Sequence, residues 1–164
     1  MSTLLDSTLF SSAAEANAWV SGILDSSTEY AITGKDLQGN IVLWNEGARR
    51  IYGYTAEEVV GKANYLILDT PEDLRAGVPQ QRLEAARRNG KWERNVVRLR
   101  KNGKRFVAGI VITPRVDSFG ETIGFLVIAR DVSHAVGLTD ELKAVQVDSI
   151  EAIMNVDLRG WNRN

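Results

Sequence analysis

The residues that could do chemistry are few in this chain of 164 residues, which contains no cysteine and one histidine, His134. Without cysteine there is no disulfide, no thiolate metal site and no thiol nucleophile. A Ser-His-Asp triad would depend on His134, but the surrounding RDVSHAVGL is typical of a strand end that runs into a helix. We therefore interpret His134 as a surface or linker residue, and we expect no catalytic residue and no metal site.

The charges are balanced, with a formal net charge of −1. No basic stripe is visible, so nucleic acid is not an expected partner. No apolar run approaches about 18 residues, so we expect no membrane span. The N-terminus carries an early acid and no basic segment, unlike a signal peptide. The missing cysteine fits a reduced, cytoplasmic location, and it is also compatible with other compartments.

The most ordered stretch, WNEGARRIYGYTAEEVVGK at residues 44–62, predicts two very short helices. Asn45 is a suitable N-terminal cap for the first, and Gly53 ends it. Thr55 and Glu58 have the spacing of a capping box at the start of the second. Helices this short are marginal in isolation, so we expect them to be held by packing against a larger element.

Longer elements flank this stretch. Residues 8–25 predict an amphipathic helix, and residues 28–45 predict a β-hairpin. Residues 70–89 predict a longer helix that starts at Pro71 and is broken at Pro79. The apolar stripe of the N-terminal helix consists of Phe10, Ala13, Ala16, Val20 and Leu24.

From Trp92 the pattern changes to that of three antiparallel strands. Asn102-Gly103 is a strong hairpin signal between the first two strands, and DSFGE is the second turn. The last two strands are apolar on both faces, whereas a sheet with one face in water should alternate apolar and polar residues. We therefore expect the short helices to cover one face, and the N-terminal helix, a partner subunit or both to cover the other.

This order of elements resembles the PAS fold over about residues 25–133. The segments that carry the likeness are DLQGNIVLWNEGARRIYGYTAEEVVGK, RRNGKWERNVVRLRKNGKRFVAGIVITPRVDSFGETIGFLVIARDVS and its terminal Arg-Asp-Val-Ser. The resemblance implies an α+β domain in which a five-stranded antiparallel sheet and short helices enclose a pocket. It also implies that residues 44–62 form a pocket wall.

The resemblance also suggests functional positions. Asp131 and Ser133 match the family's exit motif, at which a movement of the sheet passes to a following helix; the alternative for Asp131 is local helix capping alone. The residues that we expect to line an apolar pocket are Leu43, Asn45, Ala48, Ile51, Tyr52, Leu66, Leu68, Leu83, Asn95, Leu99, Ile110 and Phe125. The same residues could instead form an ordinary packed core.

The cofactor classes of the family can be compared with the sequence. The photoadduct flavin and covalent coumarate classes need a cysteine, which this chain lacks. Histidine-ligated haem is disfavoured because residues 71–90 contain no histidine. A noncovalent flavin, with Trp92 and Asn95 facing its ring, a small apolar or mixed ligand, and no stable cofactor all remain open.

The expected domain boundaries are a flanking helix at 1–25, a PAS domain at 26–133 and a linker helix at 134–150. The tail, 151–164, contains AIMNVDLRG, which echoes AITGKDLQG at 31–39. That echo predicts the start of a second PAS repeat, and hence a fragment of a longer protein.

Three functions are consistent with these features. The first is a ligand- or cofactor-sensing input domain of a bacterial-type signalling protein, such as a two-component system, with a downstream output domain. The second is a ligand-free dimerisation module whose pocket is filled by side chains. The third, a small α+β enzyme, is disfavoured because the strands offer no convergent acid–base groups. The exposed apolar surface predicts a homodimer in either of the first two cases.

Overall fold

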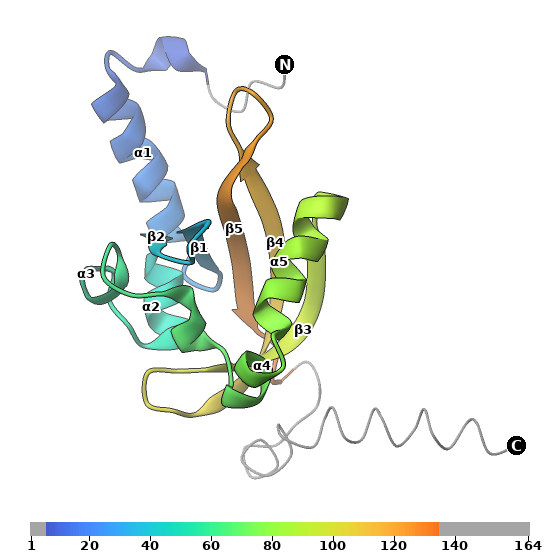
Figure 1. Cartoon of the computed structure of the whole chain (residues 1–164). Coiled ribbons are helices and arrows are strands. Elements are labelled where there is room, and N and C mark those ends of the chain that lie inside the picture. The colour runs from blue at the N-terminus through green and yellow to red at the C-terminus, as the bar shows by residue number, and fades with distance from the viewer. Residues whose placement is uncertain (1–5, 135–164) are drawn as a thin grey trace, which may run out of the picture.

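The structure is a computed structural model that describes residues 6–134. Its centre is a five-stranded antiparallel sheet in the order β2-β1-β5-β4-β3 (Figure 1). The strands are β1 (Ala31–Asp36), β2 (Ile41–Trp44), β3 (Trp92–Leu99), β4 (Arg105–Val116) and β5 (Thr122–Asp131). The helices are α1 (Ala13–Ser26), α2 (Glu46–Tyr52), α3 (Ala56–Val59), α4 (Pro71–Arg75) and α5 (Val78–Asn89), with 3-10 turns at Ser7–Leu9 and Tyr65–Leu68. The expected α+β fold is confirmed.

The two short helices of residues 44–62 form as the capping signals predict. The Asn45 side chain accepts a hydrogen bond from the Ala48 N–H, and Gly53 ends α2 with φ at 90°. Thr55 and Glu58 make both hydrogen bonds of the capping box. Glycine suits the end of α2 because an L side chain rarely adopts a positive φ.

Two helix boundaries differ from the predictions. The expected division of residues 70–89 into two helices is present, but Pro79 does not make the break, because it lies in the first turn of α5, where its missing N–H would have no helical partner. The break comes earlier, at Gly77, whose φ is 68°. The N-terminal helix begins at Ala13 and not at residue 8, because Ser12 caps it by accepting the Glu15 N–H.

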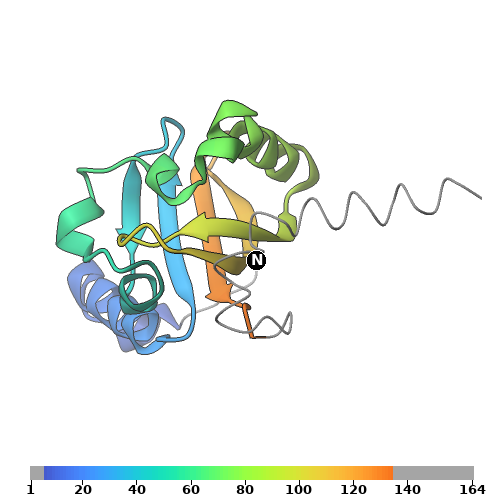
Figure 2. The same cartoon turned by 90° about the horizontal axis from the view of Figure 1, so that it is seen from below.

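The short helices cover one face of the sheet, here called the inner face (Figures 1 and 2). Helix α2 packs against β1, α3 against β2, and α5 against β3 and β4. On β4 the inner residues are Phe106, Ala108, Ile110 and Ile112, all about 1% exposed or less. The main core therefore lies between these strands and the helices.

The opposite, outer face of the sheet is less covered. Helix α1 packs mainly against α2 and extends beyond the sheet (Figure 1). None of its residues is buried, and Trp19 and Ile23 are 51% and 47% exposed. In the expected apolar stripe, Ala13 is exposed and Phe10, Ala16, Val20 and Leu24 are only partly buried, so the stripe remains without a full covering among the described residues.

Asn45 joins α1, β1 and α2. Its Nδ2 donates to the carbonyls of Leu24, Ser27 and Tyr30 at 2.7, 3.2 and 3.1 Å. Its Oδ1 accepts from the N–H groups of Ile32 and Ala48 at 2.8 and 2.9 Å. A buried amide with five partners fixes where α1 meets the sheet.

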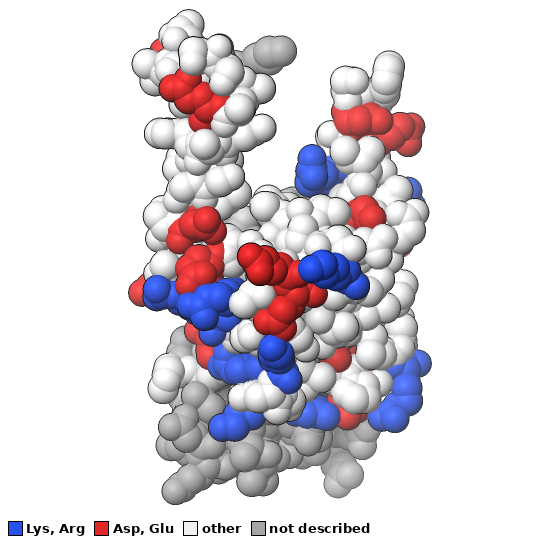
Figure 3. Space-filling model, turned by 90° about the vertical axis from the view of Figure 1, so that its left-hand side faces the viewer, with Lys and Arg blue, Asp and Glu red and all other residues white. Residues whose placement is uncertain are grey.

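Several expectations concern the C-terminal part of the chain and the molecular surface. The linker helix at 134–150, apart from its first residue, and the tail at 151–164 lie outside the described residues. His134, the last described residue, is exposed. Over residues 6–134, no helix has the length and apolar content needed to cross a bilayer. Figure 3 shows acidic and basic side chains intermixed on one face of the molecule.

The role of Asn45 gives a stability prediction. Asn45→Ala removes the cap and leaves buried backbone groups without partners, so we expect the free energy of unfolding to fall by about 2–4 kcal/mol in urea titrations. Asn64→Ala is the matched control, because Asn64 also caps a helical turn but is only partly buried. It should cost about 1 kcal/mol. Equal losses for the two variants would contradict the role assigned to Asn45.

Candidate functional site

Seven of the twelve predicted pocket residues come together on the inner side of the sheet. Ala48, Ile51 and Tyr52 of α2 are buried, as are Ile110 and Phe125 of the sheet. Leu68 is fully buried in the 3-10 turn, and Leu83 of α5 packs against this core from its edge. Their clustering is equally what a packed core requires.

Four predicted pocket residues lie elsewhere, which corrects the expected pocket. Leu43 pairs with Gly34 and Asn95 with Gly109, on the outer face. Leu99 follows the inward-facing Arg98, so its side chain points to the opposite side of the strand. Leu66 is 36% exposed. The register of the strands, which the sequence alone leaves open, decides these faces.

Two further expectations change. Asn45 is buried, but its amide is fully engaged in the joint between α1, β1 and α2. Asn95 and Trp92 cannot both face a flavin ring, because residues three apart on a strand point to opposite faces. Trp92 instead packs against the core, with the Arg82 guanidinium 5.6 Å from its ring centre.

The interior beside the apolar core is polar, and the sequence analysis missed this feature. The charged and phenolic residues that meet there form the interior cluster, defined as Lys35, Tyr52, Tyr65, Asp69, Asp73, Arg82 and Arg98. All seven are less than 9% exposed. The signal available in the sequence was the polar residues at alternate positions on predicted strands, with Lys35 on β1 and Arg98 on β3.

Arg82 of α5 binds both carboxylates of the interior cluster. Its Nη1 lies 3.1 Å from Asp69 and its Nη2 lies 2.7 Å from Asp73. Asp69 also pairs with Arg98 through a backbone bridge to the edge strand β3, but the closest distance between their charged groups is 3.7 Å. Arg82 therefore makes two short ion pairs, whereas Arg98 has only the longer contact to Asp69.

Lys35 is held in a site that disfavours its charge. Burial, with a further contribution from the nearby Arg98 and Arg82 cations and against the opposing effect of Asp69, lowers the pKa of its ammonium group to about 7. The ammonium lies 4.1 Å from the centre of the Tyr65 ring. Near neutral pH, Lys35 thus exchanges between its charged and neutral forms.

Arg98 and Tyr52 keep polar atoms without hydrogen-bond partners. The Nε and Nη1 of Arg98 and the hydroxyl of Tyr52 are buried and make no hydrogen bond of acceptable geometry. Burial raises the pKa of Tyr52 well above its usual value, with a smaller contribution from Tyr65, so the phenol keeps its proton. Unsatisfied buried donors are rare in native proteins and point to a missing acceptor.

A second polar arrangement, the exit network, lies where β5 ends. We define it as Arg100, Asp131, Ser133 and the backbone atoms that they bind. Arg100 donates to the Ile51 carbonyl at the end of α2 and to Asp131, both at 2.5 Å. Asp131 accepts the Ser133 N–H at 2.9 Å, and the Ser133 hydroxyl accepts the Val107 N–H at 3.2 Å.

These contacts lower the pKa of the Asp131 carboxyl group. Partial burial by itself would raise the pKa of its carboxyl group, but the hydrogen bonds from Ser133 and the Arg100 guanidinium outweigh burial and lower the pKa. Asp131 is therefore held ionised between two elements. The local-capping contact to Ser133 is present, and the contact to Arg100 adds a connection to α2.

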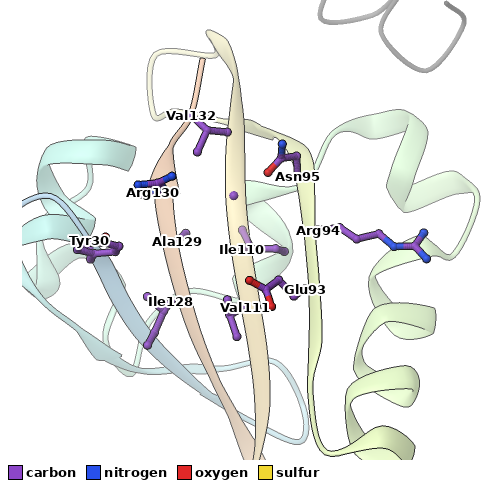
Figure 4. A pocket seen from close by; sticks show the side chains of 11 residues that line it. Tyr30, Glu93, Arg94, Asn95, Ile110, Val111, Ile128, Ala129, Arg130 and Val132 are labelled. Atoms are coloured by element: carbon purple, nitrogen blue, oxygen red, sulfur yellow. The ribbon is translucent and has the colours of Figure 1, made fainter. Parts of the chain in front are cut away.

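The outer face of the sheet carries a groove of about 300 Å³, here called the outer groove. Figure 4 shows it across β3, β4 and β5. Val111 and Ile128 form part of its floor, and Tyr30, Asn95 and Arg130 add polar groups. Three of these residues, Tyr30, Asn95 and Arg130, are exposed, so the groove is open to solvent.

Metal chemistry gains no support from the described side chains. Within residues 6–134, no group of three or more His, Asp or Glu residues lies close enough together to hold an ion.

Comparisons with known proteins agree on one family. A family model described as a PAS domain matches residues 29–134. Two-component system protein A of Emericella nidulans is 39% identical over 112 residues, which cover 68% of this chain. The matched part is only 16% of that relative's length.

Solved structures show the same fold. The PAS domain of a protein from Colwellia psychrerythraea has a TM-score of 0.66 at 27% identity, covering 73% of this chain and 98% of that chain. A PAS domain from a two-component sensor histidine kinase has a TM-score of 0.61 at 14% identity, covering 73% and 99%. The second likeness is one of fold alone.

The low pKa of Lys35 gives a pH-dependent prediction. The folded state releases the Lys35 proton above about pH 7, whereas the unfolded state keeps it to about 10.5. Stability from this group therefore rises with pH in that window. Lys35→Met should stabilise the protein more at pH 6 than at pH 9, by roughly 1–3 kcal/mol in urea unfolding.

Lys104→Met, at an exposed turn position, is the control for this prediction. Its effect on the free energy of unfolding should be the same at the two pH values. If the two variants change the free energy of unfolding with the same pH dependence, burial does not lower the pKa of Lys35.

Proposed function

This chain is a member of the PAS domain family, and from that membership we propose that it is a sensory input module. In this proposal, the interior registers a small ligand or cofactor, and the C-terminal end passes the change to a downstream output domain. The family consists of sensory modules that are generally non-catalytic, so we assign the chain no reaction of its own. The missing cysteine fits the cytoplasmic location that we propose.

An output partner of the two-component type is supported by the relative from Emericella nidulans, whose name describes a two-component system protein. Because this chain spans a small part of that relative, the rest of such a protein would supply the output.

The observation that carries the proposal is the position of Arg100. One end of its guanidinium holds the Ile51 carbonyl, next to Tyr52 of the interior cluster, and the other end holds Asp131. The guanidinium also lies 4.0 Å from the centre of the Phe106 ring. A shift of α2 therefore alters the group that orients Asp131, and with it the backbone at Ser133. Asp131 and Ser133 are proposed to transmit the signal in this way.

A ligand-free dimerisation module is the second candidate function. Two observations favour it: side chains fill much of the interior, and the outer groove and α1 leave apolar surface uncovered. Symmetric homodimers are the commonest closed assembly, and the outer face has the mixed apolar and polar character of such interfaces. A homodimer is compatible with both candidates, since a dimer can also transmit a signal.

Transmission predicts an effect of Asp131→Ala on output. In a fusion of the chain to a reporter histidine kinase, we expect basal kinase activity to change about 5-fold or more, in line with typical allosteric coupling energies of about 1–3 kcal/mol. The melting temperature should fall by only a few degrees, because the lost capping contact is worth about 0.5–2 kcal/mol.

Asp117→Ala is the matched control for this experiment. Asp117 likewise accepts backbone N–H groups, those of Phe119 and Glu121, but in the hairpin at the far end of β4 and β5. It should leave kinase activity unchanged. Equal activity of the two variants would return Asp131 to a purely local capping role.

The dimer is tested by sedimentation at tens of micromolar protein. Ile128→Lys places a charge in the outer groove, so we expect it to shift a wild-type dimer to monomer. Leu74→Lys, on the exposed side of α4 and away from the outer groove, should leave the dimer intact. A wild-type monomer at these concentrations, or dissociation by both variants alike, would contradict an interface on the outer face.

A further inference from the structure

The interior cluster holds more positive than negative charge. Its cations are Lys35, Arg82 and Arg98, and its carboxylates are Asp69 and Asp73. Arg82 takes the short contacts to both carboxylates, at 3.1 and 2.7 Å. One unit of positive charge is thus in excess whenever Lys35 is protonated.

The excess positive charge of the interior cluster lies at Arg98. Its side chain is 2% exposed, its Nη2 is 3.7 Å from Asp69, and its Nε and Nη1 have no acceptor. Burial alone would lower the pKa of Arg98, but neighbouring oxygen atoms of Tyr65, Tyr52 and Asp69 outweigh it and raise the pKa. The guanidinium therefore stays charged, and a buried charge is costly unless it is paired and hydrogen-bonded.

The hydroxyl oxygens of Tyr52 and Tyr65 lie close to the Arg98 guanidinium, but neither makes a hydrogen bond of acceptable geometry with its Nε or Nη1. The Thr33 hydroxyl donates to the Val127 carbonyl at 3.1 Å, so at its 3.1 Å contact with Tyr65 it accepts the Tyr65 proton. The Tyr52 hydroxyl is fully buried and has no partner, and it remains a donor because its pKa is raised by burial. Arg98 and Tyr52 together offer donors and no free carboxylate.

We propose that the interior cluster is a binding site for a small monovalent anion, held by the Arg98 guanidinium and the Tyr52 hydroxyl beside Lys35. The site goes beyond the sensory role, because an anion can bind here whether or not the domain transmits a signal. Its chemistry is that of a single negative charge with exposed lone pairs. Halides, nitrate and short carboxylates such as formate share that chemistry.

The packing around the site sets the size of the anion. The Arg98 guanidinium lies 5.0 Å from the centre of the Tyr65 ring, and the Tyr52 and Phe106 rings are 5.7 Å apart. Rings packed so closely limit any ligand at this site to a small ion. An extended ligand would have to displace core side chains.

An open groove lies beside the residue that pairs with Lys35. Phe125 lies directly across from Lys35 in the β1–β5 ladder. Phe125 also lines an open groove of about 520 Å³ between α5 and the two hairpin turns, together with Leu37 and Leu83. Movement of these side chains would open the interior next to Lys35.

The test is a thermal melt of the full chain at constant ionic strength. Sodium gluconate, whose anion is too large for the site, is replaced stepwise by sodium chloride, sodium nitrate or sodium formate. We expect a saturable rise in melting temperature of about 3–8 °C with at least one of the three, since an anion that binds only the folded state stabilises it. The anion that saturates at the lowest concentration distinguishes a halide site from a carboxylate site.

Tyr52→Phe removes one donor without changing the shape of the core, so the apparent dissociation constant of the anion should rise about tenfold. Tyr30→Phe makes the same chemical change in the exposed outer groove and should leave that constant unchanged. Arg98→Met should abolish the shift; if this variant does not fold, Tyr52→Phe decides. Absence of a saturable shift in the wild type, or a shift that Tyr52→Phe keeps in full, would overturn the proposal. Either result leaves the kinase-fusion test of signalling unaffected.

Discussion

The structure is constrained most by the burial of the Arg98 guanidinium. An arginine on an edge strand would normally extend into water, but Arg98 is 2% exposed and faces the helices. Asp69 bridges to the strand at this residue, and Arg82 draws that carboxylate and Asp73 together. Burying a charge without full pairing costs several kcal/mol of folding free energy, so other interactions must stabilise the fold by at least as much. The apolar layer formed by Phe106, Ile110 and their neighbours supplies that gain.

The same constraint joins the interior to the end of the domain. Tyr52 contacts the polar interior, and the preceding carbonyl, that of Ile51, is held by Arg100, which also holds Asp131. Asn45 anchors the opposite end of α2 to α1 and β1. Helix α2 is thus fixed at its start and connected to the exit at its end. A change in charge inside the domain can reach Ser133 through this one short helix, which is the physical content of the proposed sensory function.

Much of the fold could be predicted from local signals. The caps at Asn45 and Thr55 and the hairpin at Asn102-Gly103 depend on neighbouring residues, and they form as predicted. The faces of Leu43, Asn95 and Leu99 could not be predicted, because strand register is set by pairing between distant residues. The interior cluster was missed for a similar reason: an inward-facing Arg98 on β3 becomes visible only when Asp69 and Arg82, far away in sequence, are placed around it. The inward-facing apolar members of the expected pocket, including Leu68 and Ile110, followed from the resemblance to the family fold.

The proposal that depends most on this constraint is the binding of a small anion by the buried Arg98 guanidinium and the Tyr52 hydroxyl. A crystal structure of the chain grown in sodium bromide, with anomalous diffraction data, tests it most directly. The account predicts an anomalous peak within hydrogen-bond distance of the Arg98 guanidinium and the Tyr52 hydroxyl. An interior without bromide, in which Arg98 Nε and Nη1 bond to protein oxygen atoms or ordered water, would contradict it.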